Sequence, residues 1–190
     1  SSESFVETLP HLSTYIVMSF MISLLTAAQV RNSIPKEQFS FLYLKVLPVK
    51  PGSFLKIKQI KVSILILSAS ILGLAVVGLN ERIGFDVLLA VFAIQAALCW
   101  GAGAIGLWAG ARAAKFDWTD PRYMIHGGYA MWSTVLSLIY TLCGWIILIT
   151  GWMSGYLTVA FLVFFLYVIL IYKVFFDNAV TFLIRYEWKY

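Results

Sequence analysis

Residue types that commonly do chemistry in proteins are scarce in this sequence of 190 residues. It contains two histidines, His11 and His126, and two cysteines, Cys99 and Cys143. Both cysteines lie inside apolar runs without a CxxC spacing, so we interpret them as small buried side chains. The sequence has no HExxH motif, no Cys/His cluster and no GxxxxGK[ST] loop of the kind that cradles ATP phosphates. We therefore expect this chain to be no enzyme and to hold no metal and no cofactor of its own.

Composition indicates a protein surrounded by lipid. Hydrophobic residues make up 61% of the chain and charged residues 12%, about half of the roughly 25% found in soluble domains. A soluble globule of this size and mean hydropathy of +0.87 would expose too much apolar surface to water. The sequence therefore predicts an all-α integral membrane protein in a lipid bilayer. The net charge of +5 does not indicate a nucleic-acid partner, since the basic residues lie between the apolar runs, where membrane topology accounts for them.

Five uncharged runs are long enough to cross a bilayer as helices, which requires about 17–25 apolar residues. They cover approximately residues 12–28, 62–79, 87–109, 129–150 and 156–176. We expect these five transmembrane helices to form a single transmembrane domain over residues 1–190. The odd number of spans and the start at Ser1-Ser2 lead us to expect a segment of a longer chain.

The basic residues orient these helices. Of the fourteen Lys and Arg residues, all except Arg82 fall on one side of the predicted membrane. By the positive-inside rule that side is the cytoplasm, so the N-terminus is predicted outside and the C-terminus in the cytoplasm. We expect the plasma (inner) membrane as the location.

The spans themselves carry little polarity. No Asp, Glu, Lys or Arg lies in the middle of a run, which argues against ion-coupled transport and proton pumping. Gln95 is the strongest polar feature, and we interpret it as making an interhelical or a backbone hydrogen bond. The third span ends in a stripe of small residues, Ala102, Gly106 and Gly110, which allows another helix to approach closely. Such a stripe is typical of packing inside one bundle or of a seam between two membrane halves, and the sequence leaves both open.

The connection over residues 29–61 is too long for a simple turn. Pro35 suits the first turn of a helix with Ser33 as its cap, and helical spacing of apolar residues continues to Leu47, before Pro48. Such a helix fits two roles, of which composition alone favours the first. It can lie on anionic headgroups, or it can dock a cytoplasmic partner.

Motifs in the two cytoplasmic connections resemble those of permease subunits of type-2 ABC exporters. In the first connection, Lys36-Glu37, then Phe41, then the run LKVLPV at 44–49 resemble the family stretch R-E-G-x-x-F-x-L-L-K-x-L-P-[IV]-S-P. In the second, AKFDWTDPR at 114–122 resembles the turn P-x-F-x-x-[DE]-N-P. The likeness covers about residues 25–150 and departs from the family pattern at Gln38, Lys50 and Thr119.

This resemblance implies that the five spans correspond to helices two to six of one permease half. It also implies a second half or a homodimer partner, and cytoplasmic ATP-binding subunits that hold ATP and magnesium. ATP binding would push on the 36–47 helix and rock the membrane halves between inward and outward states. The residues implied in partner contact are Pro35, Lys36, Glu37, Phe39, Phe41, Lys45 and Pro48, and in the second connection Asp117, Asp120, Pro121 and Arg122.

Other roles are open for some of these residues. Lys45 is also placed to meet lipid phosphate, and Asp117 and Asp120 are also placed to cap the turn before Pro121. At the level of the whole chain, the alternative to an exporter subunit is a membrane anchor or scaffold that transports nothing and uses the first connection only for assembly.

Overall fold

The structure, a computed structural model, describes residues 9–37, 50–81, 83–113 and 127–187. Every regular element in these ranges is helical, and five helices are long and apolar enough to cross a membrane. This confirms the predicted helical membrane architecture. The elements are α2 (Leu9–Ser33), η1 (Pro35–Glu37), α4 (Pro51–Glu81), α5 (Phe85–Ala113), α6 (Gly127–Met153) and α7 (Leu157–Glu187).

The helices are longer than the spans predicted from uncharged runs. α4 begins at Pro51 instead of near residue 62, and α7 continues past residue 176 to Glu187. Each has 31 residues, about 46 Å of helix at about 1.5 Å per residue, whereas the hydrocarbon core of a bilayer is about 30 Å thick. The additional turns at the start of α4 carry Lys56, Lys58 and Lys61, whose aliphatic stems can lie along apolar surface while their charged ends reach water. Counting uncharged residues therefore underestimated these two helices.

The start of α4 has a local cause. Pro51 occupies the first helical turn, where its missing N–H costs no hydrogen bond. The carbonyl of Lys50 accepts hydrogen bonds from the backbone N–H groups of Ser53 at 2.9 Å and Phe54 at 3.2 Å. Residues that the sequence analysis placed in a connecting stretch therefore begin a membrane helix.

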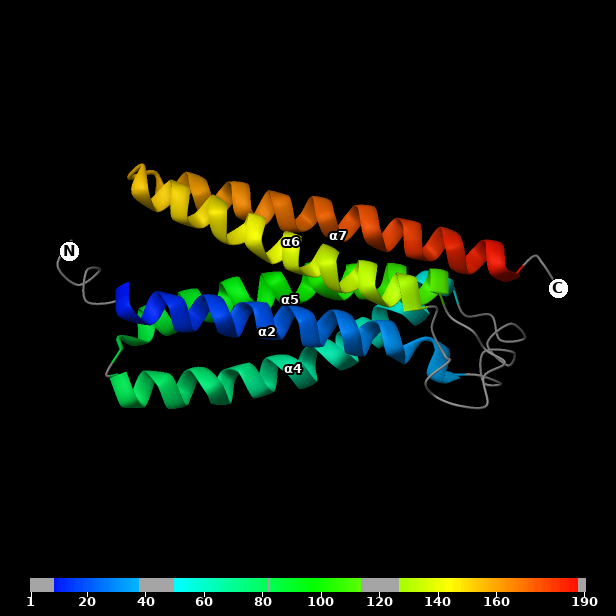
Figure 1. Ribbon diagram of the computed structural model, residues 1–190, viewed down its shortest axis with the longest axis horizontal. Coiled ribbons are helices and arrows are strands. Elements are labelled where there is room, and N and C mark those ends of the chain that lie inside the picture. The colour runs from blue at the N-terminus through cyan, green and yellow to red at the C-terminus, as the bar shows by residue number, and fades with distance from the viewer. Residues whose placement is uncertain (1–8, 38–49, 82, 114–126, 188–190) are drawn as a thin grey trace.

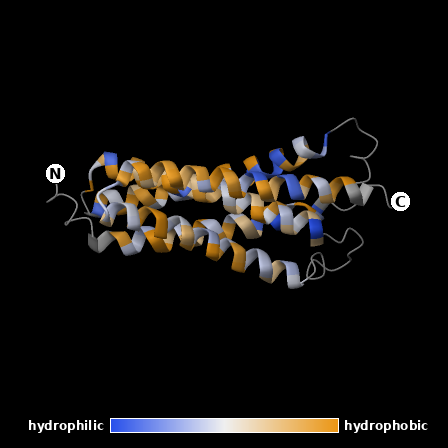
Figure 2. Cartoon of the chain, turned by 90° about the horizontal axis from the view of Figure 1, so that it is seen from above, coloured by the Kyte–Doolittle hydropathy of each residue, from blue (hydrophilic) through white to orange (hydrophobic). Residues whose placement is uncertain are grey.

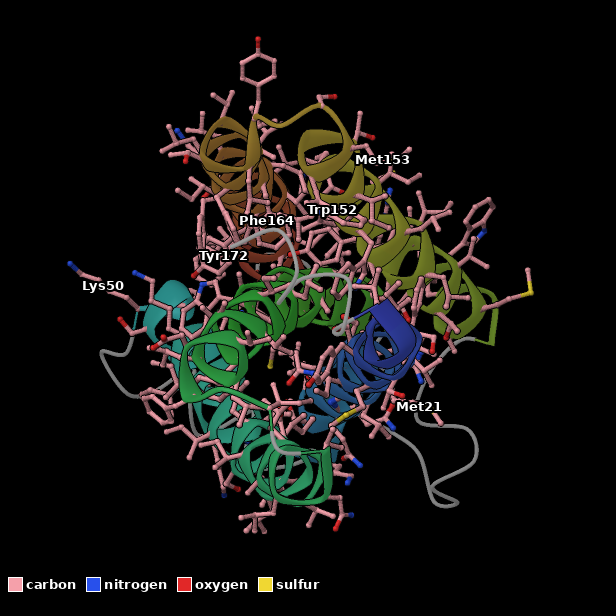
Figure 3. The ribbon with its side chains drawn as sticks, turned by 90° about the vertical axis from the view of Figure 1, so that its left-hand side faces the viewer. Met21, Lys50, Trp152, Met153, Phe164 and Tyr172 are labelled. Carbon is pink, nitrogen blue, oxygen red and sulfur yellow. The ribbon has the colours of Figure 1, made fainter. Side chains whose placement is uncertain are left out.

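The five helices lie side by side along one axis (Figure 1). The hairpin of α6 and α7 lies on one side of the bundle, α4 lies on the opposite side, and α2 and α5 lie between them. The view along the bundle shows α5 at the centre of this arrangement (Figure 3). The described start of α2 and the described end of α7 lie at opposite ends.

Small residues explain the central position of α5. All residues from Gly101 to Leu107 are buried. A Cβ atom at Gly101 would meet the Tyr140 hydroxyl on α6, one at Gly103 would lie 2.8 Å from Nε2 of Gln59 on α4, and one at Gly106 would meet the backbone of α2. Three neighbours thus approach α5 closely, and at Gly106, where the neighbour is backbone that cannot rotate away, the approach requires glycine.

Hydrophobic residues predominate over the middle of the bundle, and hydrophilic residues are more frequent toward one end (Figure 2). Helix α4 shows the division most clearly. Its buried positions recur every three or four residues along one face, while Leu65 and Leu72 are each 70% exposed on the other. In a lipid environment this exposed face is solvated by acyl chains. The buried positions of α4 are Leu55, Gln59, Ser63, Ile66, Ser70, Leu74 and Gly78.

Candidate functional site: the basic end of the bundle

One end of the bundle collects the charged side chains, and we call it the basic end. Here α2, α5 and α7 finish and α4 and α6 begin, so both connections predicted to meet a partner start and finish here. The opposite end carries the short links from α4 to α5 and from α6 to α7. The described basic residues at the basic end include Arg31, Lys36, Lys50, Lys56, Lys58, Lys61, Arg112 and Lys173.

Arg31 joins the end of α2 to the beginning of α6. Its Nη1 donates hydrogen bonds to the Ala130 carbonyl at 2.8 Å and to Oγ of Ser133 at 2.7 Å. Ser133 is fully buried and donates its own proton to the Ala130 carbonyl at 2.9 Å. The guanidinium carries a full charge, and hydrogen bonds to charged groups are stronger than neutral ones. The connection that follows α2 therefore leaves from a helix end that is hydrogen-bonded to the start of α6, where the connection between α5 and α6 finishes.

Arg112, in the last turn of α5, connects α5 to α6 and α7 in a similar way. Its guanidinium carbon lies 4.3 Å from the ring centre of Phe182 on α7, and 5.7 Å from the rings of Trp108 and Tyr129. Trp108 and Tyr129 also pack edge to face with their centres 6.2 Å apart. Arg112 is in the last turn of α5 and Tyr129 in the first turn of α6. The aromatic rings therefore hold together both helix ends from which the second connection departs.

Helices α4 and α7 also touch at this end. A Cβ atom on Gly52 would lie 3.8 Å from Cγ2 of Val180. One turn further along α4, Nζ of Lys56 lies 5.8 Å from the ring centre of Phe176, within the range of a cation–π contact. All five helix ends are thus connected at the basic end through side chains.

The predicted coupling residues fall only partly within the described structure. Pro35, Lys36 and Glu37 form the short 3₁₀ turn η1 directly after α2, where Pro35 is buried and Lys36 exposed. Ser33 does not cap a new helix, because it belongs to the last turn of α2 and its hydroxyl donates to the Val30 carbonyl at 2.7 Å. The remaining predicted contact residues lie outside the described residues: Phe39, Phe41, Lys45, Pro48, Asp117, Asp120, Pro121 and Arg122.

The small-residue stripe Ala102, Gly106 and Gly110 is covered by α2 of the same chain. A Cβ atom at Gly106 would meet the carbonyl of Ala27, and one at Gly110 would lie 2.6 Å from the carbonyl of Arg31. Ala102 is fully buried. Of the two interpretations open from the sequence, packing inside the bundle describes what these residues do in this chain.

Of the two kinds of hydrogen bond expected of Gln95, it makes the interhelical one, and the structure adds partners that the sequence analysis did not identify. Its Oε1 accepts a 2.5 Å hydrogen bond from Oγ of Ser70 on α4. Gln59, assigned from the sequence to a connection, is buried on α4 and donates from Nε2 to the Trp100 carbonyl at 2.8 Å. Thr26 on α2 lies with its hydroxyl 3.2 Å from Sγ of Cys99. The polar residues of α4 at helical spacing, Gln59, Ser63 and Ser70, were the signal in the sequence.

We call these residues the polar seam, because they lie along the line where α2, α4 and α5 meet. Ile22 and Ile66 pack with Cys99 in the same interior, and Ser63 lies against the Cys99 thiol. The polar seam comprises Ser19, Ser23 and Thr26 of α2, Gln59, Ser63 and Ser70 of α4, and Gln95 and Cys99 of α5.

At the end opposite the basic end, an apolar pocket of about 310 Å³ lies between α2, α5, α6 and α7. Its walls include Tyr15, Val91, Trp145 and Phe161, and Trp152, labelled in Figure 3, also lines it. The pocket is close to the lower limit of about 300 Å³ for small-molecule sites. The surface that faces the pocket is almost entirely carbon, although Asp86 and Trp145 are among its lining residues.

No group of three or more His, Cys, Asp or Glu side chains able to hold a metal ion occurs within the described ranges. Both cysteines are free thiols; Cys99 is buried and Cys143 is half-buried. Comparison of the chain with protein-family models, with curated proteins and with solved structures finds no match.

Proposed function

We propose that this chain is the membrane-spanning subunit of an ATP-driven exporter of the ABC type, which moves when a separate ATPase subunit acts on its basic end. The observation that carries the proposal is the Arg31 junction. Arg31 binds Ala130 and Ser133 at the start of α6, so the two connections that resemble partner-binding segments are mechanically linked. A force applied next to η1 is transmitted through these hydrogen bonds to α6.

Two features of the sequence support this proposal. The chain has no P-loop, so energy for transport must come from a partner. The predicted spans have no charged residue in their middle, which argues against coupling to an ion gradient. With the basic end in the cytoplasm, as the positive-inside rule predicts, both connections face the compartment that contains ATP.

The test is to purify the chain with its native partners in mild detergent and to identify co-purifying subunits by mass spectrometry. ATP hydrolysis is then compared for the native complex and for Glu37→Arg, a charge reversal in η1. The matched control is Glu81→Arg, which makes the same change at the other end of the membrane, where α4 finishes.

We expect a stoichiometric ATPase whose binding or stimulation is lost in Glu37→Arg and retained in Glu81→Arg. A complex that is intact but contains no ATPase contradicts the proposal and establishes the anchor or scaffold role instead. An equal effect of both substitutions contradicts the assignment of η1 as the coupling contact.

A further inference from the structure

Of the polar groups of the polar seam that have no hydrogen-bond partner among the described residues, three belong to side chains at most 1% exposed. They are Nε2 of Gln95, Oε1 of Gln59 and Oγ of Ser23. Oε1 of Gln95 accepts a hydrogen bond from Ser70, and Nε2 of Gln59 donates one to the Trp100 carbonyl. In each side-chain amide, the other polar atom therefore has no hydrogen-bond partner. An unsatisfied polar group in a membrane interior costs several kcal/mol.

The three groups lie on facing helices. Ser23 is one turn before Ala27, whose backbone faces Gly106, so Ser23 also points toward α5. Gln95 is one turn before Cys99 on α5, and Gln59 is one turn before Ser63 on α4. Cys99 contacts both Thr26 and Ser63, which brings the three helices together at this level. Because α4 runs antiparallel to α5, Gln95 and Ser23 lie about one turn to one side of this level and Gln59 about one turn to the other, so the free groups are spread along the seam.

The chemistry of these groups defines what can satisfy them. The free Gln95 N–H needs an acceptor, the free Gln59 oxygen needs a donor, and the Ser23 hydroxyl can take either role. A carboxylate offers acceptors alone and an ammonium offers donors alone. A hydroxyl or an amide offers both.

The seam also disfavours charge. It is built from Ser, Thr, Gln and Cys side chains, so a charged ligand would lose its hydration without gaining a counter-charge. Its outer wall is α4, which packs through one face and leaves Ile64, Leu65 and Leu72 exposed on the other. α4 is therefore the helix that separates the seam from the surrounding lipid.

We propose that the polar seam is a binding site for an uncharged ligand, or for the uncharged polar part of an amphiphile, that carries both hydrogen-bond donors and acceptors in hydroxyl or amide groups. If the proposed export function holds, this ligand class is the class of the exported cargo, and in that respect the assignment rests on the proposed function. Binding itself requires no ATPase and can be measured on this chain alone.

The native thiol of Cys99 reports on the seam. In a Cys143→Ser background, the full chain in lipid nanodiscs is treated with methyl methanethiosulfonate, a small neutral reagent, and modification is followed by intact mass spectrometry. The matched control moves the only thiol to Leu98 (Leu98→Cys with Cys99→Ser and Cys143→Ser). Leu98 is also fully buried and at the same depth, but it packs on Gly144 of α6, away from the seam.

We expect Cys99 to react at least about tenfold faster than the thiol at position 98, because a site that admits neutral polar molecules admits the reagent. Acetamide should then slow modification of Cys99, whereas acetate and methylammonium at equal concentration should not. Gln95→Met should reduce this protection about tenfold, the equivalent of one lost hydrogen bond of about 1.4 kcal/mol. Gln59→Met provides a second variant of the same design if Gln95→Met does not fold.

Two results would overturn the proposal. Equal reactivity at positions 98 and 99 means that the seam is dry and closed. Fast reaction at Cys99 without selective protection by acetamide means that the seam contains water but no ligand site. Either result leaves the exporter proposal intact, since that proposal depends on the co-purifying ATPase.

Discussion

The hydroxyl of Ser70 on α4 donates a 2.5 Å hydrogen bond to Oε1 of Gln95 on α5, in the interior of a membrane bundle. Both side chains are buried, at 5% and 0% exposure. In lipid, where no hydrophobic force holds one helix against another, such bonds are among the contacts that fix neighbouring helices. This bond and the Gln59–Trp100 bond connect α4 to the central helix.

Ser70→Ala should therefore weaken the attachment of α4. The substitution removes the donor and leaves Oε1 of Gln95 without a partner, so we expect a loss of about 0.6–1.7 kcal/mol in the free energy of unfolding. Unfolding by SDS in mixed micelles measures it. The control is Ser68→Ala, two residues earlier, where the exposed hydroxyl only donates to the Leu65 carbonyl of its own helix. Equal stability of the two variants would show that the Ser70 bond contributes nothing.

Gly106→Ala tests the close contact of α5 with α2. The added methyl group would collide with the Ala27 carbonyl, which is backbone and cannot rotate away, so the helices must separate. We expect destabilisation of roughly 1–3 kcal/mol, the usual range for overpacking. Gly128→Ala is the control, because nothing lies within 4 Å of the position of its new Cβ. A fully stable Gly106→Ala protein would contradict the packing described for this stripe.

Arg31→Ala should loosen the start of α6 in particular. It removes three hydrogen bonds from a charged group, two of them to Ala130 and Ser133 on α6 and one to Asn32, for a loss of about 1.5–3 kcal/mol. Hydrogen exchange should become faster at amides 127–133. Lys173→Ala, which removes an exposed cation from the same end, should leave this exchange unchanged. If exchange in α6 is the same in both variants, Arg31 does not link the two connections.

Arg112→Ala should have a smaller effect. Arg112 is exposed, and cation–π contacts at exposed sites contribute about 0.5–1 kcal/mol, so we expect a decrease in unfolding free energy of that size. Phe182→Leu, which removes the nearest ring, should give a similar loss, and the double substitution should cost less than the two single losses added together. Strict additivity in this cycle would mean that the two side chains do not interact.

Much of the architecture follows from the order of residues. Continuous apolar runs can only be helices in lipid, because each backbone N–H and C=O must be paired within its own segment. The number of helices could be predicted for the same reason, and the gathering of Lys and Arg at one end follows from their positions between alternate runs. The helix lengths could not be predicted: α4 and α7 continue through charged turns, and the limits of an uncharged run mark the lipid core rather than the ends of the helix.

Which helices and side chains contact one another could be seen only in the tertiary structure. The small residues Gly106 and Gly110 predict a close helix contact, but only the packed bundle shows that α2 of the same chain makes it. The same is true of Arg31 and Ser133, which are separated by about a hundred residues, and of Ser70 and Gln95. The periodicity of a sequence shows which face of a helix is small or polar. Which helix packs against that face depends on how all five helices pack together, so only the tertiary structure shows it.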